Sequence, residues 1–279
     1  MRLAAVTVDG QSLPAVERDG DLYALAVATG TDLAALLAAG PAAVREAVAG
    51  ARERLVGARL QAPLRPGKIV AVGLNYFDHI RETGMERPKR PLLFAKFPSS
   101  VIGPEEPIVI DPGLTERVDW EVELAVIVGA PMRHVTPAEA LAGVAGYAVA
   151  NDVSARDLQF SDGQWVRAKS LDTFCPLGPV VVTPDEIGDP QALRLWTAVN
   201  GQTVQDSSTS EMVFGVAELL SFCSRSFTLD PGDILLTGTP WGCGEFMTPR
   251  RSLVPGDFVE AGVDRIGVLR NPVVARTAP

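Results

Sequence analysis

Short apolar runs rich in β-branched residues dominate the chain from residue 69 onward. KIVAVG, EVELAVIVG, GPVVVT and DILLTG are examples, and Pro-Gly pairs at 112–113, 231–232 and 255–256 and an Asn-Gly pair at 200–201 separate such runs. These pairs are typical of tight turns between paired strands. The pattern therefore predicts a largely antiparallel β structure with hairpins.

Helices are few in this part of the chain. The segment TPAEALAGV offers Thr136 as an N-cap and Pro137 as the first helical residue. In SEMVFGVAELLSFCSR, apolar residues from Met212 to Cys223 recur at helical spacing. Neither GxxxxGK(S/T) nor GxGxxG stands between a strand and a helix, which disfavours a nucleotide-binding doubly wound fold.

Residues 1–60 follow a different pattern, in which short strand-like runs alternate with two Ala-rich helical segments. TDLAALLAAG begins at a capping residue, Thr31 or Asp32, and PAAVREAV begins at Pro41, a residue favoured in the first turn of a helix. A small α+β domain is expected here. The predicted division is an N-terminal domain over residues 1–60, a linker with two prolines and a glycine over 61–68, and a main domain over 69–279.

Composition and charge narrow the classes of function. The chain has 279 residues, 47% of them hydrophobic, which is enough for a substantial core. Its net charge of −9 and the lack of any long block of like charge disfavour binding to nucleic acid or to anionic membranes. The three cysteines, Cys175, Cys223 and Cys243, have no CxxC spacing, so neither a disulfide framework nor a zinc knuckle is indicated. With no apolar run long enough for a signal peptide or a membrane helix, a soluble protein of the reducing cytoplasm is expected.

Two acids interrupt one of the most apolar runs, VDWEVELAVIVG. Successive side chains of a strand point to opposite faces, so Glu121 and Glu123 share a face with Ala125 and Ile127, while the other face is wholly apolar. Two like charges about 4 Å apart repel by roughly 4 kcal/mol at an effective dielectric constant near 20. A bound cation, a raised pKa of one acid, or a position at a sheet edge in water would each relieve this repulsion.

A third carboxylate follows in GYAVANDVSARD, where an apolar run ends abruptly at Asn151-Asp152. Asp152 at a strand end is either an Asx-type cap or a metal ligand. Three carboxylates without a histidine or a thiol favour a hard divalent ion such as Mg²⁺, Mn²⁺ or Ca²⁺.

The two histidines of the chain lie in different settings. His79 and Glu82 are three residues apart in VGLNYFDHIRETG and would meet on one face of a helical turn, the minimal arrangement of a general base held by a carboxylate. The alternative is an exposed surface turn. His134 lies in a loop before a helix cap and is interpreted as a surface residue.

Polar residues suited to binding an anion occur in two further segments. Arg156, Gln159 and Lys169 follow soon after Asp152 and could donate to an oxyanion or to a substrate carboxylate, although Lys169 could equally be a solvated loop residue. LLTGTPWGCGEF ends a strand in a Gly-rich turn, where backbone N–H groups and the Thr239 hydroxyl could hold an anion.

Taken together and in this order, these segments resemble the fumarylacetoacetate hydrolase family. The resemblance runs through VGLNYFDH, FAKFPSSVIGP, EVELAVIVG, GYAVANDVSARDLQ, LDPGDILLTGTPWGCG and further segments over residues 68–274. Residues 1–60 are similar to the variable N-terminal domain of the shorter bacterial and mitochondrial members. The resemblance implies a mainly β fold, a mixed β-sandwich roll with a few helices, and a homodimer.

The resemblance also assigns roles to the residues that match the motifs. The implied metal ligands are Glu121, Glu123 and Asp152, with Mg²⁺ or Mn²⁺ as the ion and Ca²⁺ as a substitute in a crystal. The implied catalytic residues are His79 and Glu82, on a lid that orders over the substrate, and Lys169; the implied substrate contacts are Arg156, Gln159 and Thr239.

The activity implied is hydrolysis of a C–C bond in an acylpyruvate or related 1,3-dicarbonyl acid of the fumarylpyruvate type. His79 would activate a water that attacks the distal carbonyl, Lys169 with Gln159 or Arg156 would stabilise the oxyanion, and the ion would stabilise the enolate. The same metal-enolate core serves decarboxylation of β-keto acids such as oxaloacetate, keto–enol or 2-hydroxyhepta-2,4-diene-1,7-dioate type isomerisation, and ureidoglycolate-type elimination within the family. The sequence does not separate these reactions.

Two departures from the family pattern bear on the substrate. Trp241 and Cys243 stand where small or aliphatic residues are common, and Ala168 and Leu171 stand where Gly and Phe are frequent. Either departure could reshape the pocket, which leaves an unusual substrate or a lost ancestral activity open. A non-catalytic, metal-stabilised dimer, with the N-terminal domain as a partner-binding module, is the alternative of a different class. The presence of both catalytic candidates, His79 and Lys169, disfavours it.

Overall fold

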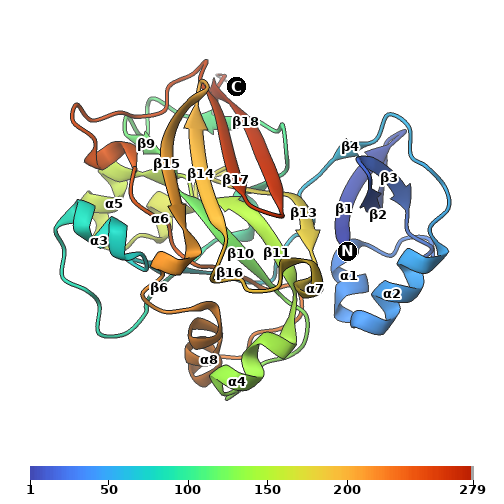
Figure 1. Ribbon diagram of the computed structural model, residues 1–279. Coiled ribbons are helices and arrows are strands. Elements are labelled where there is room, and N and C mark those ends of the chain that lie inside the picture. Colours follow the sequence, from blue (N-terminus) through green and yellow to red (C-terminus); the bar gives the residue numbers. More distant parts are fainter. Residues whose placement is uncertain (278–279) are drawn as a thin grey trace.

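Residues 1–277 are described by a computed structural model, in which β-sheets form the body of the protein and short helices surround them (Figure 1). The larger sheet has eleven strands. In the order in which they are hydrogen-bonded, nine of them are β3 (Asp21–Ala24), β2 (Gln11–Arg18), β1 (Arg2–Val8), β13 (Cys175–Val182), β11 (Val144–Asn151), β10 (Val122–Val128), β16 (Ile234–Leu236), β5 (Ile69–Gly73) and β6 (Leu92–Lys96); β4 (Arg59–Leu60) also pairs with β1, and β7 (Val101–Ile102) with β13.

Seven further strands form two smaller sheets. The five-stranded sheet has the order β15 (Gln202–Ser208), β14 (Arg194–Val199), β17 (Phe258–Val263), β18 (Gly267–Ala275) and β8 (Ile108–Ile110), and β9 (Val118–Asp119) pairs with β12 (Ser154–Ala155). Most pairs are antiparallel, but β16 with β5, β18 with β8 and β13 with β7 are parallel. The predicted mainly β fold with mixed sheets is therefore confirmed.

The helices are short, and the longest has eleven residues. They are α1 (Leu33–Ala38), α2 (Pro41–Gly50), α3 (Phe77–Thr83), α4 (Pro137–Ala140), α5 (Arg156–Asp162), α6 (Val166–Lys169), α7 (Pro184–Ile187) and α8 (Val216–Ser226). Two expected caps are present: Asp32 accepts a hydrogen bond from the backbone N–H of Ala35 (2.7 Å), and Thr136 forms a capping box with Glu139. Within residues 1–277, none of the helices has the length and apolar character needed to cross a membrane.

Only one of the four predicted turn pairs closes a hairpin. Asn200 and Gly201 have φ of 53° and 77° and join β14 to its antiparallel partner β15, as a type I′ turn requires. The Pro-Gly pair at 112–113 instead lies between β8 and β9, which do not pair with each other: β8 pairs with β18, and β9 pairs with β12. The pair at 231–232 lies just before β16, and the pair at 255–256 lies just before β17. Neither strand is hydrogen-bonded to the strand that precedes it in the sequence. The prediction of hairpins at the Pro-Gly pairs was wrong, because strands distant in sequence supply the neighbours.

Strand β10 lies in the middle of the larger sheet, between β11 and β16. Val122, Leu124, Val126 and Val128 pack into an apolar cluster shared with α8 and the five-stranded sheet. Its other face, which carries Ala125 and Ile127, packs into a second cluster that includes residues of α1 and α2. Both faces are buried, so the alternative that the acids of this strand lie at a sheet edge in water is wrong.

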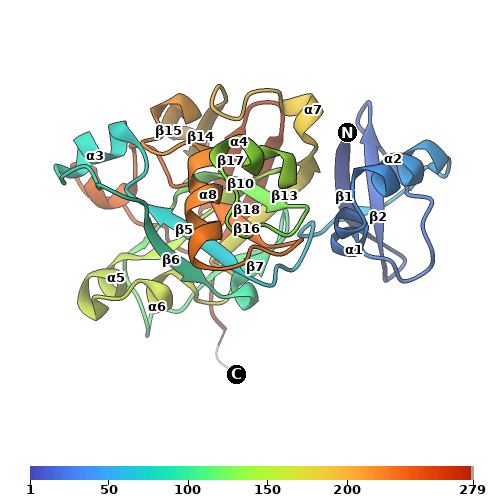
Figure 2. The ribbon, with the colours of Figure 1, turned by 90° about the horizontal axis from the view of Figure 1, so that it is seen from below.

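Residues 1–60 lie to one side of the larger body in two perpendicular views (Figures 1 and 2). Strand β1 nevertheless continues the larger sheet, because Arg2 and Leu3 pair with Val182 and Val181 of β13. Leu3 is fully buried in the cluster that also contains Val181 and residues of α1 and α2. The division into two domains at residues 61–68 stays a prediction, and both hydrogen bonds and apolar packing cross it.

We predict that Leu3→Ala lowers the free energy of unfolding by about 3 kcal/mol, within the range of roughly 2–5 kcal/mol for truncating a buried leucine. All four tryptophans lie beyond residue 60, so their fluorescence reports the larger body alone. Because Leu3 packs across the junction, the fluorescence transition in urea should shift to lower denaturant. Val56→Ala, at a position that is 79% exposed, should leave it in place. A fluorescence transition that Leu3→Ala does not move would contradict a shared core.

Candidate active site

A cavity of about 200 Å³ opens beside α3, α5 and α6. These helices lie on the side of the larger body away from residues 1–60 in both views (Figures 1 and 2). Six of the nine predicted site residues line the cavity: His79, Glu121, Arg156, Gln159, Lys169 and Thr239. Its apolar wall includes Leu74, Met85, Phe94, Phe160, Trp165 and Phe246.

The three predicted metal ligands come together because of the register between β10 and β11. Val122 pairs with Asn151 in this antiparallel ladder, which places Glu121 and Glu123, at the start of β10, beside Asp152, just after the end of β11. One carboxylate oxygen of each acid lies within 4.8 Å of those of the other two. All three side chains are buried. Oxygen ligands alone make this a candidate site for a hard divalent cation.

Two buried lysines partly neutralise these acids. Lys169 Nζ lies 2.7 Å from Glu121 Oε2 and 2.8 Å from Asp152 Oδ2. Lys96 Nζ lies 2.7 Å from Asp152 Oδ1 and also donates to the backbone carbonyl of Lys169. The interpretation of Lys169 as a solvated loop residue is therefore wrong, since its side chain is 2% exposed.

The lysines act unequally on the two glutamates. Burial alone would raise the pKa of Glu121, but the charges of Lys169 and Arg156 outweigh it and lower this pKa to about 2. Burial and the charges of Asp152 and Glu121 raise the pKa of Glu123 well above its usual range. Within residues 1–277 no cationic side chain lies within ion-pair distance of Glu123, and the backbone N–H of Gly238 donates to it at 2.6 Å.

The cluster fits a divalent cation by two observations. It offers oxygen ligands only, and Glu123 has no cationic partner within ion-pair distance among the described residues. A buried carboxylate without such a partner calls for compensation, which a bound ion would supply. These residues could therefore hold a divalent metal ion.

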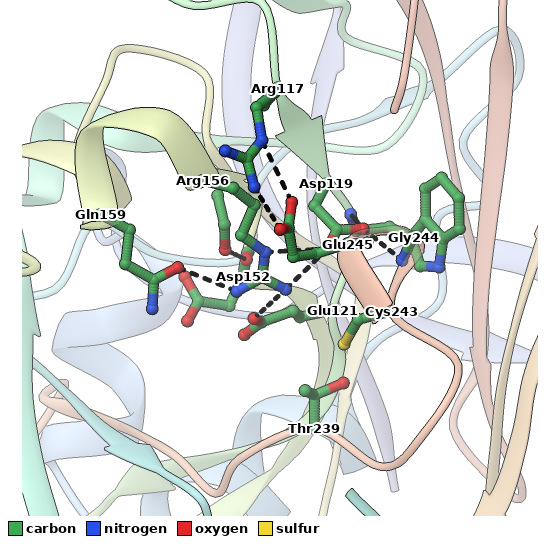
Figure 3. Close-up of polar contacts among 12 residues, drawn as sticks. Arg117, Asp119, Glu121, Asp152, Arg156, Gln159, Thr239, Cys243, Gly244 and Glu245 are labelled. Carbon is green, nitrogen blue, oxygen red and sulfur yellow. Dashed lines mark hydrogen bonds and ion pairs between the residues drawn. The ribbon is translucent and has the colours of Figure 1, made fainter. Parts of the chain in front are cut away.

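Arg156, the first residue of α5, joins the acidic cluster to the cavity wall. Its Nε donates to Asp119 Oδ2 (2.8 Å), its Nη2 lies 2.7 Å from both Asp119 Oδ2 and Glu121 Oε1, and its Nη1 donates to Gln159 Oε1 (2.9 Å). Figure 3 shows the guanidinium group among these three partners. Asp119 and Glu121 thus fix the plane of the guanidinium group, whose fork geometry suits a carboxylate.

Sequence reasoning missed Asp119. Besides holding Arg156, this buried acid accepts hydrogen bonds from the backbone N–H groups of Gly244 (2.7 Å) and Glu245 (3.1 Å). A signal was present, because Asp119 precedes Glu121 and Glu123 at the same two-residue spacing. Lys96 was also missed, and here the sequence offers no signal, since a lysine at the end of an apolar run usually extends its ammonium group to water.

His79 and Glu82 lie on α3, and their side chains meet as expected. His79 Nδ1 is 3.0 Å from Glu82 Oε2, and Glu82 Oε1 accepts from the backbone N–H of Gly242 at 2.8 Å. The His79 ring stands edge-on to Phe246, with 5.5 Å between ring centroids. The imidazole is buried, so the alternative of an exposed surface turn is wrong, whereas His134 is exposed.

The turn at residues 239–245 connects α3 with the acidic cluster. Gly242 has φ of 97°, and a Cβ atom there would lie 2.1 Å from the carbonyl oxygen of Val204, so only glycine fits. The Thr239 hydroxyl accepts from the Nε2 of Gln205 at 2.9 Å, and Gln205 Oε1 accepts from the backbone N–H of Val122 at 3.0 Å. Gln205, a further residue that sequence reasoning missed, thereby links this turn to the start of β10.

The residues that depart from the family pattern lie outside the cavity. Trp241 is 45% exposed, and its indole N–H donates to the backbone carbonyl of Asp206 at 3.2 Å. Ala168, Leu171 and Cys243 do not line the cavity either. None of these four residues forms part of the cavity wall, whose aromatic part consists of Phe94, Phe160, Trp165 and Phe246.

Known proteins match the part of the chain that contains all the candidate site residues. The family described as fumarylacetoacetate (FAA) hydrolase C-terminal matches residues 68–274. A mitochondrial oxaloacetate tautomerase of Rattus norvegicus is 49% identical over 211 residues, which are 75% of this chain and 67% of the relative. A human mitochondrial oxaloacetate tautomerase is 46% identical over 212 residues, with the same shares.

Solved structures match along the full length. A fumarylacetoacetate hydrolase of Exiguobacterium antarcticum is 40% identical, with a TM-score of 0.90 over 99% of this chain and 100% of that chain. A 2-hydroxyhepta-2,4-diene-1,7-dioate isomerase of Mycobacterium marinum is 34% identical, with a TM-score of 0.80 over 100% of both chains.

We predict that Asp152→Asn weakens Mn²⁺ binding, measured by isothermal titration calorimetry, by more than about 100-fold, since loss of even an outer-shell partner costs roughly 10–100-fold. Glu82→Gln is the matched control: it removes a negative charge near the same cavity but outside the three-carboxylate cluster, and should leave the affinity within a few-fold. Circular dichroism would verify the fold of both variants. Equal losses in the two variants, or none in Asp152→Asn, would contradict the assignment.

Proposed function

The chain belongs to the fumarylacetoacetate hydrolase family, and we propose that it is a metal-dependent enzyme that interconverts the keto and enol forms of a short 2-oxo dicarboxylic acid of the oxaloacetate type. The observation that carries the proposal is that His79, which Glu82 holds, lines one cavity with Lys169, Arg156 and Glu121, an acid of the carboxylate cluster. Relatives 46–49% identical to this chain are named oxaloacetate tautomerases, which supports the reaction class.

The residues of the cavity suit an anionic substrate. A divalent ion held by Glu121, Glu123 and Asp152, with Mg²⁺ or Mn²⁺ as the proposed identity, would act as a Lewis acid on the negative charge that develops at the 2-oxo group. Arg156 and Lys169 offer charged donors, and Gln159 and Thr239 offer neutral ones, for the substrate carboxylates. Phe246 packs against both the His79 ring and the Arg156 guanidinium group, 5.9 Å from its ring centroid, and holds the base and the anion-binding group in one place.

The His79–Glu82 pair performs the proton transfer. Since Nδ1 lies 3.0 Å from Glu82 Oε2, the carboxylate holds the tautomer with the proton on Nδ1 and leaves Nε2 as the base. His79 can then remove a proton from the carbon next to the 2-oxo group, or return one to it, while Lys169 and Arg156 stabilise the oxyanion. This reaction needs no water nucleophile.

A second candidate is hydrolysis of a C–C bond in an acylpyruvate, as the resemblance first implied. It is favoured by the structural likeness, at a TM-score of 0.90 and 40% identity, to a fumarylacetoacetate hydrolase. The His79–Glu82 pair would then activate a water molecule. Incubation of an acylpyruvate in H₂¹⁸O separates the two reactions, because hydrolysis places ¹⁸O in the acid product and tautomerisation leaves the carbon chain intact.

We predict that His79→Gln lowers kcat for tautomerisation of oxaloacetate by about 10²–10⁴-fold, the usual contribution of a positioned acid–base group. The measurement is the decay of enol ultraviolet absorbance above the uncatalysed rate, with saturating Mg²⁺. His134→Gln, at the other and exposed histidine, is the matched control and should retain full activity. Full activity of His79→Gln, with Mn²⁺ affinity unchanged, would remove His79 from the mechanism.

A further inference from the structure

A second group of possible metal ligands lies beside the carboxylate cluster. His79, Glu82 and Cys243 each offer one ligand atom, and these three atoms lie within 4.8 Å of one another. α3 supplies the first two, and the hydrogen bond from Gly242 N to Glu82 holds the cysteine-bearing turn against this helix. The two groups share no residue.

The chemistry of this second group differs from that of the first. An imidazole nitrogen, a carboxylate oxygen and a thiolate sulfur suit a borderline ion such as Zn²⁺, whereas Mg²⁺ prefers oxygen ligands alone. Three protein ligands also match a zinc site that keeps its fourth position for water. Because His79 lines the cavity, the group is close to a route from solvent.

The surroundings of Cys243 favour a cation. The thiol is fully buried, and its hydrogen-bond contacts with Gln205 Nε2 and the carbonyl oxygen of Pro240 are both long, at 4.0 Å. Burial raises the pKa of the Cys243 thiol, the charges of Asp119, Glu121 and Glu82 raise it further, and the charge of Arg156 lowers it. The acids around the sulfur atom in this group thus outnumber the arginine, which suits a bound cation.

We propose that His79, Glu82 and Cys243 form a second metal site, which binds Zn²⁺ and thereby inhibits the enzyme. Binding replaces the S–H bond of Cys243 with a sulfur–zinc bond and releases its proton to solvent, while neutral His79 and ionised Glu82 donate lone pairs. The existence of the site rests on its geometry alone. The inhibition rests on the proposed function, because a bound ion takes His79 and Glu82 away from proton transfer.

Co²⁺ is the direct probe, because a thiolate ligand produces a near-ultraviolet charge-transfer band that oxygen ligands do not. With saturating Mg²⁺ on the full-length protein, one equivalent of Co²⁺ should produce this band. Cys243→Ala and the nearly isosteric Cys243→Ser should lose it. Cys223→Ser, at another buried thiol in α8, is the matched control and should keep it, as should Asp152→Asn.

Zn²⁺ inhibition is then measured in the same Mg²⁺ buffer. The Zn²⁺ concentration for half-inhibition should rise at least tenfold in both Cys243 variants and stay unchanged in Cys223→Ser. A charge-transfer band that persists in Cys243→Ala, or no band in the wild type, would overturn the site. A band that depends on Cys243 without any effect of Zn²⁺ on turnover would leave the site standing and overturn the inhibition, together with the role of His79 in the proposed function.

Discussion

The electrostatic repulsion among Glu121, Glu123 and Asp152 is the constraint on which the rest of the site depends. The register of β10 against β11 places three carboxylates within 4.8 Å of one another in the buried centre of the protein. Charges this close are tolerated away from water only when cations compensate them. Lys169 and Lys96 supply part of this compensation, and a divalent ion would supply more.

The compensating network extends from the acids to the acid–base pair. Asp119 fixes Arg156 against Glu121 and also accepts from the backbone of the turn at Gly244. The same turn donates to Glu82, which orients His79. The position of the base relative to the acidic cluster is thus set by hydrogen bonds and ion pairs that run through one turn. This one turn therefore brings the base, the anion-binding arginine and the candidate ion site together.

The sequence predicted the features that depend on local pattern. The alternation of faces along β10, the Asp32 and Thr136 caps and the pairing of His79 with Glu82 need only neighbours a few residues apart. Long-range features were missed, because local pattern does not specify which distant strands pair: the Pro-Gly turns close no hairpins, and β1 continues the larger sheet through β13. The burial of Lys96 was missed for the same reason, since only its partner Asp152, 56 positions further along the chain, distinguishes it from a surface lysine.

The most direct test of the central claim is a crystal structure with Mn²⁺ and oxalate, a stable analogue of a 2-oxo acid, using the anomalous signal of manganese. The account predicts one manganese ion, about 2.0–2.2 Å from an oxygen of each of Glu121, Glu123 and Asp152, with oxalate beside it in the cavity that Arg156 and Lys169 line. Manganese bound elsewhere, or a cluster whose cationic partners are still only Lys169, Lys96 and Arg156, would contradict it.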